Sequence, residues 1–425
     1  MVSHRSQKER TLLVGCPLKS SHRTSPTGHY EFTPEESLEE LGSLVVSAGG
    51  EVVDQLIQER AYYDSATLIG KGKLQELAEK KHQLKADLVV FDEALSPAQQ
   101  RNIEQCIACR AIDRTQLILD IFARRARTRE GKLQVELAQL NYLLPRLSGK
   151  GIELSRLGGG IGTRGPGETK LETDIRKIRR RIHTIKQELD HVRTHRALHR
   201  GLRSSIPLPT ISLVGYTNAG KSTLFNQLTQ AGTFASDQLF ATLDPLLRRL
   251  KLPSKRQAVL SDTVGFINKL PTGLVSAFRA TLEEIGQAAL LLHVIDVSNP
   301  HWAQQRESVL QVLDNLSYAS KPILEVYNKV DLIDSAPVPG TRHEYVSVSA
   351  VRGSGIPLLL KKIDELLQQD PLVRARFLFD HQNINLLSQL HSNSRLISET
   401  YTDEGVCVEV EAPFSLVQRL KQFQA

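Results

Sequence analysis

The stretch "PTISLVGYTNAGKSTLFNQL", residues 209–228, places a short β-branched run before a glycine-rich loop and a helical pattern. The loop has the spacing Gly215-x-x-x-x-Gly220-Lys221-Ser222. Backbone N–H groups in such a loop turn inward on phosphate oxygens, the lysine reaches the β- and γ-phosphates, and the serine hydroxyl ligates Mg²⁺. The stretch therefore predicts a strand–loop–helix phosphate site in a doubly wound α/β domain. The loop residues expected at the nucleotide are Gly215, Tyr216, Thr217, Asn218, Ala219, Gly220, Lys221, Ser222 and Thr223.

A second segment, "SDTVGF" at residues 261–266, ends an apolar run. This run predicts a strand that ends at Asp262, where the carboxylate would bind Mg²⁺ through a water ligand. The Gly265 N–H would donate a hydrogen bond to the γ-phosphate. Thr242, in "LFATLDP", matches a switch threonine that contacts Mg²⁺ and the γ-phosphate and lets go after hydrolysis. Phe266 stands where many such proteins keep a glutamine that orients the attacking water. A phenyl ring cannot orient water, so either chemistry is slow and gated by a partner or another group contributes.

A third segment, "ILEVYNKVD", is expected to recognise the base of the bound nucleotide; it ends in Asn328-Lys329-x-Asp331. A carboxylate accepts two N–H bonds from the N1 and N2 edge of guanine, an edge that adenine lacks. Ser349-Ala350, closing "YVSVSA", is expected to brace the base from the other side. These residues predict GTP and GDP as ligands, with Lys221, Gly265, Thr242 and Asn218 at the reacting phosphate.

The basic residues are concentrated in one part of the chain. The formal net charge is +7, and residues 121–203 contain 20 Lys and Arg against 8 Asp and Glu, so this part carries +12 and the remainder −5. A concentrated positive surface indicates a polyanionic partner such as nucleic acid, because neutralised phosphates release counterions. The alternative is a charged helix that only faces solvent.

The same part has two heptad seams, which predict two helices that fold back as an antiparallel hairpin. The first seam is Leu133, Leu137, Leu140, Leu144 and Leu147; the second is Leu171, Ile175, Ile178, Ile182, Ile185, Leu189 and Val192. The glycine-rich stretch "LGGGIGTRGPGE", 157–168, would form the tip, either as an RNA probe or as a passive turn. It lacks the preceding strand that a dinucleotide-binding turn requires. The expected RNA contacts are Arg156, Gly158, Gly159, Gly160, Gly162, Arg164, Gly165, Gly167 and Lys170.

The remaining chain completes a multidomain α/β protein. Residues 1–111 alternate strand and helix patterns and predict a small α/β domain, in which Thr33, Pro34 and Glu36 form a helix capping box. Residues 112–203 form the hairpin, 204–372 the nucleotide domain, and 373–425 a small α+β module without a chemical motif. No apolar run is long enough for a membrane span and no secretory signal is present, so a cytoplasmic protein is expected.

The motif order, together with "RLGGGIGTRGPGETKLETDIRKIRRRI", is similar to the HflX family of ribosome-associated GTPases over Thr11 to Leu372. The resemblance implies binding of the large ribosomal subunit and its RNA, splitting of ribosomes under stress, and release after GTP hydrolysis. We expect a monomer with a low intrinsic GTPase rate that ribosomal subunits stimulate. Asn218 matches an asparagine that ligates K⁺ in some related GTPases; shaping the loop is the alternative role. A second functional hypothesis is a GTP-timed RNA-binding or chaperone module that does not split ribosomes.

Overall fold

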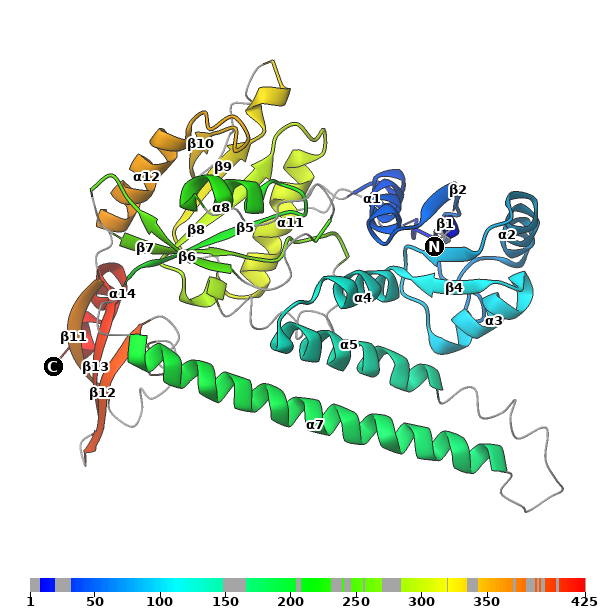
Figure 1. The fold of residues 1–425 in the computed structure, drawn as a ribbon, viewed down its shortest axis with the longest axis horizontal. Helices are drawn as coiled ribbons and strands as arrows, with labels where there is room; N and C mark the ends of the chain where they lie inside the picture. Colours follow the sequence, from blue (N-terminus) through cyan, green and yellow to red (C-terminus); the bar gives the residue numbers. More distant parts are fainter. Residues whose placement is uncertain are drawn as a thin grey trace, which may run out of the picture. The chain divides into compact units, whose positions relative to one another are not determined.

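The protein is represented by a computed structural model with two compact units (Figure 1). It describes residues 8–19, 32–147, 166–203, 208–230, 239–240, 246–254, 257–269, 284–318, 320–334, 343–369, 372–379, 387, 390, 394–402 and 405–424; within 166–203, side chains are described for 172–192. The first unit comprises Met1–Arg203, Gln238–Leu243 and Asn268–Ala277. The second comprises Ser204–Asp237, Asp244–Ile267 and Phe278–Ala425.

The first unit begins with a four-stranded parallel sheet in the order β2-β1-β3-β4. The strands are β1 (Arg10–Gly15), β2 (Glu51–Ile57), β3 (Leu88–Phe91) and β4 (Arg110–Asp113), and the helices are α1 (Pro34–Ser47), α2 (Lys71–Leu84), α3 (Pro97–Ile107) and α4 (Arg114–Arg125). The predicted capping box begins α1: Glu36 N–H donates to Thr33 Oγ1, and Thr33 N–H donates to the Glu36 carboxylate. Leu12, Val14, Val89 and Phe91 from the two central strands are buried in the core.

The fourth strand ends where α4 begins. Asp113, the last residue of β4, caps α4 by accepting a hydrogen bond from the Gln116 N–H at 2.9 Å. The boundary expected between residues 111 and 112 therefore falls within β4, whose last two residues stay paired with β3.

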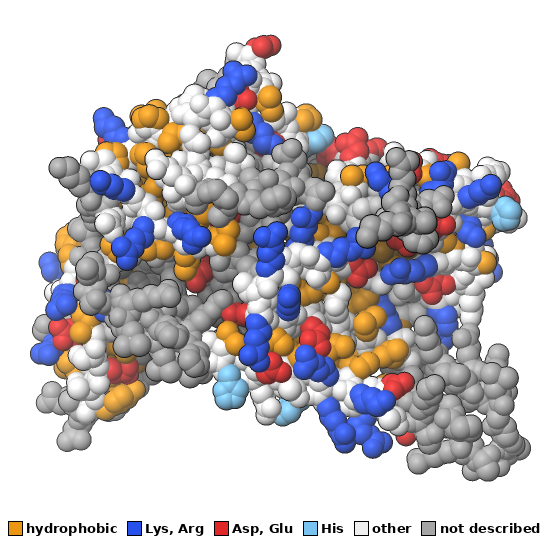
Figure 2. Space-filling model, in the orientation of Figure 1, with side chains coloured by type: hydrophobic (Ala, Val, Ile, Leu, Met, Phe, Trp, Pro, Cys, Tyr) orange, Lys and Arg blue, Asp and Glu red, His pale blue; other side chains and the backbone are white. Residues whose placement is uncertain are grey.

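The helical hairpin consists of α5 (Arg129–Leu147) and α7 (Pro166–Arg203). Its seam is formed by Leu133, Ile185 and Leu189, with Leu137 and Leu140 packed against them. Glu136 pairs with Arg181 at 2.6 Å and Arg129 with Glu188 at 3.1 Å, so the two helices run antiparallel, as predicted. Over the part of the hairpin whose side chains are described, Figure 2 shows Lys and Arg interspersed with Asp and Glu.

The last turns of α5 also contact the N-terminal sheet and the loop that follows β3. Near the end of α5, the Tyr142 hydroxyl donates to Asp113 at 2.9 Å, and Arg146 donates to the Leu95 carbonyl at 2.7 Å. These hydrogen bonds hold the last turns of α5 against the sheet. Heptad spacing does not predict such a contact. Of the predicted RNA contacts, Gly167 and Lys170 lie in the first turns of α7; Arg156, Gly158, Gly159, Gly160, Gly162, Arg164 and Gly165 lie outside the described residues.

The second unit contains a six-stranded sheet in the order β10-β9-β8-β5-β7-β6, parallel except for the edge strand β6. Its strands are β5 (Thr210–Gly215), β6 (Leu246–Lys251), β7 (Gln257–Asp262), β8 (Leu290–Asp296), β9 (Ile323–Asn328) and β10 (Glu344–Ser347). Its helices are α8 (Lys221–Thr229), α11 (Trp302–Asn315) and α12 (Ile356–Gln369), with a 3₁₀ turn η1 (Val330–Leu332). The predicted doubly wound α/β domain is confirmed.

The chain ends in a three-stranded antiparallel sheet in the order β11-β13-β12. The elements are β11 (Leu372–Phe379), β12 (Arg395–Thr402), β13 (Gly405–Pro413), α14 (Phe414–Arg419) and the 3₁₀ turn η2 (Lys421–Phe423). Phe377, Phe379 and Val408 are buried in its core with Val417 of α14. This module is α+β, as predicted. None of the helices that the structure describes combines the length and apolar character needed to cross a bilayer.

Candidate nucleotide site

The glycine-rich loop between β5 and α8 requires both of its end glycines. Gly215 has φ +154°, and a Cβ atom there would lie 2.3 Å from the Val294 carbonyl oxygen. Gly220 has φ +89°, and a Cβ atom there would lie 2.3 Å from Asn328 Nδ2. Glycine alone fits these positions, so the loop can lie close to β8 and β9 with its backbone open for phosphate.

The Lys221 ammonium lies inside this loop. Its Nζ donates to the carbonyl oxygens of Gly215 at 3.1 Å and Tyr216 at 2.7 Å. Burial lowers the pKa of Lys221 to about 8, although the Asp262 carboxylate opposes the shift. The backbone carbonyls thus fix a cation where the motif places the β- and γ-phosphates.

Ser222 and Asp262 place two oxygen atoms that could ligate a metal ion close together, next to Lys221. The Ser222 hydroxyl donates to Asp262 Oδ2 at 2.7 Å, and Asp262 is completely buried at the end of β7. A hydroxyl and a carboxylate at the end of a strand are the ligands that Mg²⁺ takes in such sites. The residues present therefore fit this ion, either directly or through water.

The segment after β7 is hydrogen-bonded to the glycine-rich loop. Phe266 N–H donates to the Gly215 carbonyl at 3.0 Å, and Thr217 N–H donates to the Phe266 carbonyl at 2.7 Å. The Phe266 side chain is buried. It therefore packs as an apolar residue and contributes no polar group for a water molecule. Thr242 lies outside the described residues.

Asn328 connects the loop with the segment that follows β10. Its Nδ2 donates to the Ala219 carbonyl at 2.9 Å, and its Oδ1 accepts from the Ala350 N–H at 3.0 Å. Ser349, beside Ala350, is buried and accepts from the Arg352 N–H at 3.1 Å. Three segments far apart in the sequence therefore meet at the predicted base site.

The carboxylate predicted to read the base is ionised and partly accessible. A hydrogen bond from Ser349, with smaller contributions from Arg352 and Lys329, lowers the pKa of Asp331 below its ordinary value. Lys329 has φ +65° and pairs with Asp296 at 2.7 Å, so its side chain is anchored at the end of β8. Sequence reasoning missed Asp296 and Arg352, because each acts through a contact between separate segments and belongs to no motif.

Asn218 differs from its neighbours in the loop. Its backbone is left-handed, with φ +60°, and its side chain is exposed, whereas Thr217 and Ala219 are buried. Asparagine tolerates this conformation better than most residues. The geometry is therefore compatible with a loop-shaping role, while the exposed amide is also accessible to a ligand.

The residues predicted to bind the nucleotide, as far as the structure describes them, lie at one edge of the six-stranded sheet, at the carboxyl ends of β5, β7 and β9. This edge is where doubly wound sheets bind ligands. The fold and the site together define a P-loop GTPase. Residues 210–329 match a family model described as 50S ribosome-binding GTPase, residues 35–123 one described as GTP-binding GTPase N-terminal, and residues 125–203 one described as GTP-binding GTPase Middle Region.

Similar proteins align over most of the chain. A GTPase HflX of Caldanaerobacter subterraneus is 47% identical over 390 residues, covering 92% of this chain and 90% of the relative. One of Alkalihalophilus pseudofirmus is 49% identical, covering 85% of this chain and 83% of the relative. One of Escherichia coli is 45% identical, covering 92% and 94%. The chain belongs to the HflX family of GTPases.

Proposed function

We propose that this GTPase binds the large ribosomal subunit and splits or recycles ribosomes in a nucleotide-dependent way. The observation that supports this function most is the pairing of a nucleotide site with a basic helical hairpin in one chain. The family model matched by residues 210–329 is itself described as ribosome-binding. The proposal includes a monomeric, cytoplasmic protein with a low intrinsic GTPase rate that the large subunit raises.

The phosphate part of the site follows from the loop geometry. The backbone N–H groups of residues 217–223 bind the phosphates, and Lys221 neutralises the β and γ oxygens. Ser222 and Thr242 ligate Mg²⁺, Asp262 holds it through water, and the Gly265 N–H contacts the γ-phosphate. The ion supplies positive charge to the phosphate oxygens when bound.

The base part accounts for guanine selectivity. Asp331 accepts the two N–H bonds of the guanine edge, and an adenine at this position would leave the carboxylate unpaired. Asn328 holds the loop and the Ser349-Ala350 segment at a fixed separation through its two hydrogen bonds. Lys329, anchored by Asp296, lines the base with its aliphatic stem.

Two roles for Asn218 are separable by experiment. Asn218→Gly retains a left-handed backbone but removes the amide. If the amide ligates K⁺, wild-type GTP turnover with large subunits is faster in K⁺ than in Na⁺, and the variant loses this difference. If the K⁺ advantage is absent, or if the variant keeps it, the residue only shapes the loop.

The hairpin supplies the RNA-binding surface in this proposal. Exposed basic residues follow α7 at Arg176, Lys177, Arg179, Arg180 and Lys186. The seam of Leu133, Ile185 and Leu189 holds the arm straight beneath this charge. A rigid basic arm that carries a glycine-rich tip suits a groove lined by phosphates.

Co-sedimentation with purified large subunits tests the function. We expect binding with a non-hydrolysable GTP analogue, weaker binding with GDP, and loss of binding when residues 158–167 are replaced by a Ser/Asn linker of equal length. Light scattering of intact ribosomes then separates the two hypotheses. Splitting by wild type supports the proposal, whereas nucleotide-dependent binding without splitting favours the GTP-timed RNA-binding or chaperone module.

A further inference from the structure

A positively charged side chain lies beside Asp331, the carboxylate proposed above to recognise guanine. Arg352 Nε lies 3.6 Å from Asp331 Oδ2. Asp331 belongs to η1, which follows β9, whereas Arg352 belongs to the turn between β10 and α12. Both segments lie within the second unit. The ion pair therefore connects two segments of the predicted base site inside a single unit.

The backbone of Arg352 is held in a closed turn. The Ser349 N–H donates to the Ser354 carbonyl at 3.0 Å, and the Gly353 N–H donates to the Ser349 carbonyl at 2.8 Å. The N–H of Arg352 itself donates to the Ser349 hydroxyl oxygen at 3.1 Å. These bonds fix the point from which the side chain extends, so the guanidinium moves by rotation about its own side-chain bonds.

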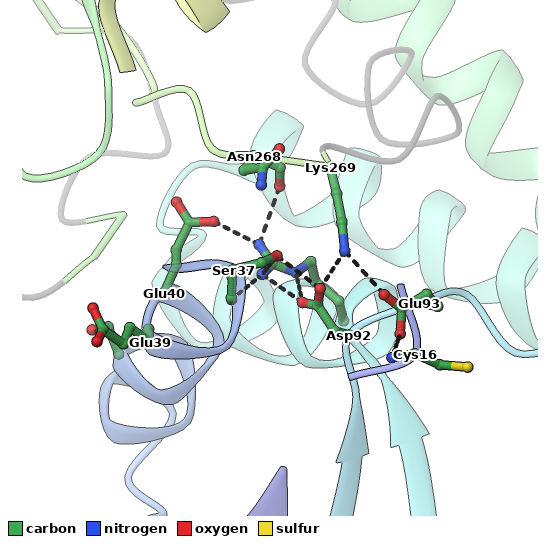
Figure 3. Close-up of polar contacts among 10 residues, drawn as sticks. Cys16, Ser37, Glu39, Glu40, Asp92, Glu93, Asn268 and Lys269 are labelled. Carbon is green, nitrogen blue, oxygen red and sulfur yellow. Dashed lines mark hydrogen bonds and ion pairs between the residues drawn. The ribbon is translucent and has the colours of Figure 1, made fainter. Parts of the chain in front are cut away.

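The exposure of Arg352 distinguishes it from an arginine that only stabilises the fold. Arg114, 2% exposed, donates to Asp92 at 2.6 Å and pairs with Glu40 at 2.7 Å (Figure 3). The Arg352 side chain is 69% exposed, and its distance to Asp331 is longer than a hydrogen bond. Exposed ion pairs contribute little to folding. The Arg352 guanidinium can therefore leave Asp331 for solvent at small cost.

The donor edge of guanine is chemically similar to the arginine side chain. Its N1–C2–N2 atoms form a guanidine unit whose N–H groups lie in one plane, and such a planar fork matches the two oxygens of a carboxylate. The Asp331 side chain is only 14% exposed, so a small part of it can be reached from solvent. A base and the Arg352 side chain both approach that part. The positive charge of the guanidinium also repels the N–H edge of the base.

We propose that Arg352 competes with the guanine base for Asp331, so that its guanidinium leaves the carboxylate when a guanine nucleotide binds. The inference rests on the role proposed above for Asp331. Because GDP and GTP carry the same base, the competition weakens binding of both by the same factor. Arg352 therefore makes the bound nucleotide easier to exchange and leaves the preference between GDP and GTP unchanged.

Nucleotide affinity of the full-length chain tests the proposal. Arg352→Met removes the charge and keeps a long unbranched side chain. In calorimetric titrations we expect it to bind GDP and a non-hydrolysable GTP analogue about two- to fivefold more tightly than wild type. Lys361→Met is the matched control, because it removes a 70% exposed cation from α12 of the same unit. Affinities of Arg352→Met equal to or below those of wild type, or an equal rise in the control, overturn the proposal.

A second background isolates the contact with the carboxylate. In Asp331→Asn the guanidinium no longer faces a negative charge, so its removal relieves no competition. We therefore expect Arg352→Met to produce no gain in affinity for xanthosine diphosphate in this background, where xanthine is the expected base. The same gain in both backgrounds would mean that Arg352 acts on the nucleotide without Asp331, and it would overturn the proposal.

The same titrations separate failure of this inference from failure of the proposed function. If wild type binds neither GDP nor the GTP analogue, the proposed function fails and the inference fails with it. If wild type binds both but Asp331→Asn keeps its preference for guanine, Asp331 is not the base reader. If Asp331→Asn loses that preference and Arg352→Met binds no more tightly than wild type, only the competition fails.

Discussion

The side-chain amide of Asn328 donates a 2.9 Å hydrogen bond to the backbone carbonyl of Ala219 in the glycine-rich loop. Its other end accepts from the backbone of Ala350. The segment proposed to recognise the guanine base and the loop proposed to bind the phosphates are therefore joined by hydrogen bonds of one side chain. A site whose parts are held together by the protein itself loses less conformational entropy when a ligand binds.

Removing this connection should weaken binding of every guanine nucleotide. Asn328→Ala leaves the buried Ala350 N–H and Ala219 carbonyl unpaired, at a cost of about 1–3 kcal/mol each. We expect the affinities for GTP and GDP to fall together by at least about tenfold, because both share the base site. Calorimetric titration with each nucleotide measures this. A loss confined to GTP would contradict the bridging role.

We expect the preference for guanine to depend on Asp331. Asp331→Asn replaces an acceptor by an amide whose NH₂ repels the guanine N–H edge and can donate to the extra carbonyl of xanthine. We expect GTP affinity to fall by about 100-fold or more and xanthosine triphosphate to become the better ligand. Competition between the two nucleotides gives the answer, and retained preference for GTP would exclude Asp331 as the base reader.

Gly215 should be irreplaceable for steric reasons. Gly215→Ala puts a methyl group 2.3 Å from the Val294 carbonyl oxygen, so the loop and β8 must separate. We expect loss of nucleotide binding and destabilisation by more than about 2 kcal/mol in denaturant unfolding. Gly72→Ala is the control, because a Cβ atom there meets nothing within 4 Å. Equal behaviour of the two variants would contradict the steric argument.

His293 should make stability depend on pH. Burial, with a smaller contribution from the positive charge of Arg306, lowers the pKa of His293 to about 3. In the unfolded chain the histidine has a pKa near 6.5 and takes up a proton below that pH, whereas in the folded chain it does not. The unfolding free energy therefore decreases as the pH is lowered below about 6.5. Between pH 7.5 and 5.5 the loss is about 1.4 kcal/mol.

His293→Leu isolates this contribution. The variant should show a shallower decrease of the unfolding free energy between these two pH values, whatever its stability at pH 7.5. Urea unfolding of wild type and variant at both pH values measures the difference. Identical decreases in the two proteins would mean that His293 is protonated in the folded state.

Sequence reasoning succeeded where the geometry is local. The loop from Gly215 to Ser222 is a continuous segment whose glycines and lysine have fixed tasks, so its spacing alone predicts a strand, a loop and a helix. The hairpin seam was predictable for the same reason, since Ile185 and Leu189 repeat with the helix period. The motif of Asn328 and Asp331 is short enough to place Asn328 beside the loop, where it contacts Ala219, while the role of Asp331 stays a prediction.

The contacts that sequence reasoning missed join distant segments. Lys269 and Asp92 are separated by 177 positions, and neither belongs to a motif. Tyr142 lies between the seam leucines Leu140 and Leu144, and its hydroxyl donates to Asp113 of β4. Such contacts depend on how strands are ordered in a sheet, and a single sequence does not contain that order.

GTP turnover with and without purified large ribosomal subunits is the measurement that decides whether the large subunit activates this GTPase. It is compared between wild type and the chain in which residues 158–167 are replaced by a Ser/Asn linker. We expect slow turnover without subunits, a strong increase with subunits for wild type, and no increase for the linker variant, whose nucleotide affinity is unchanged. Turnover of the wild type that is the same with and without subunits would contradict it.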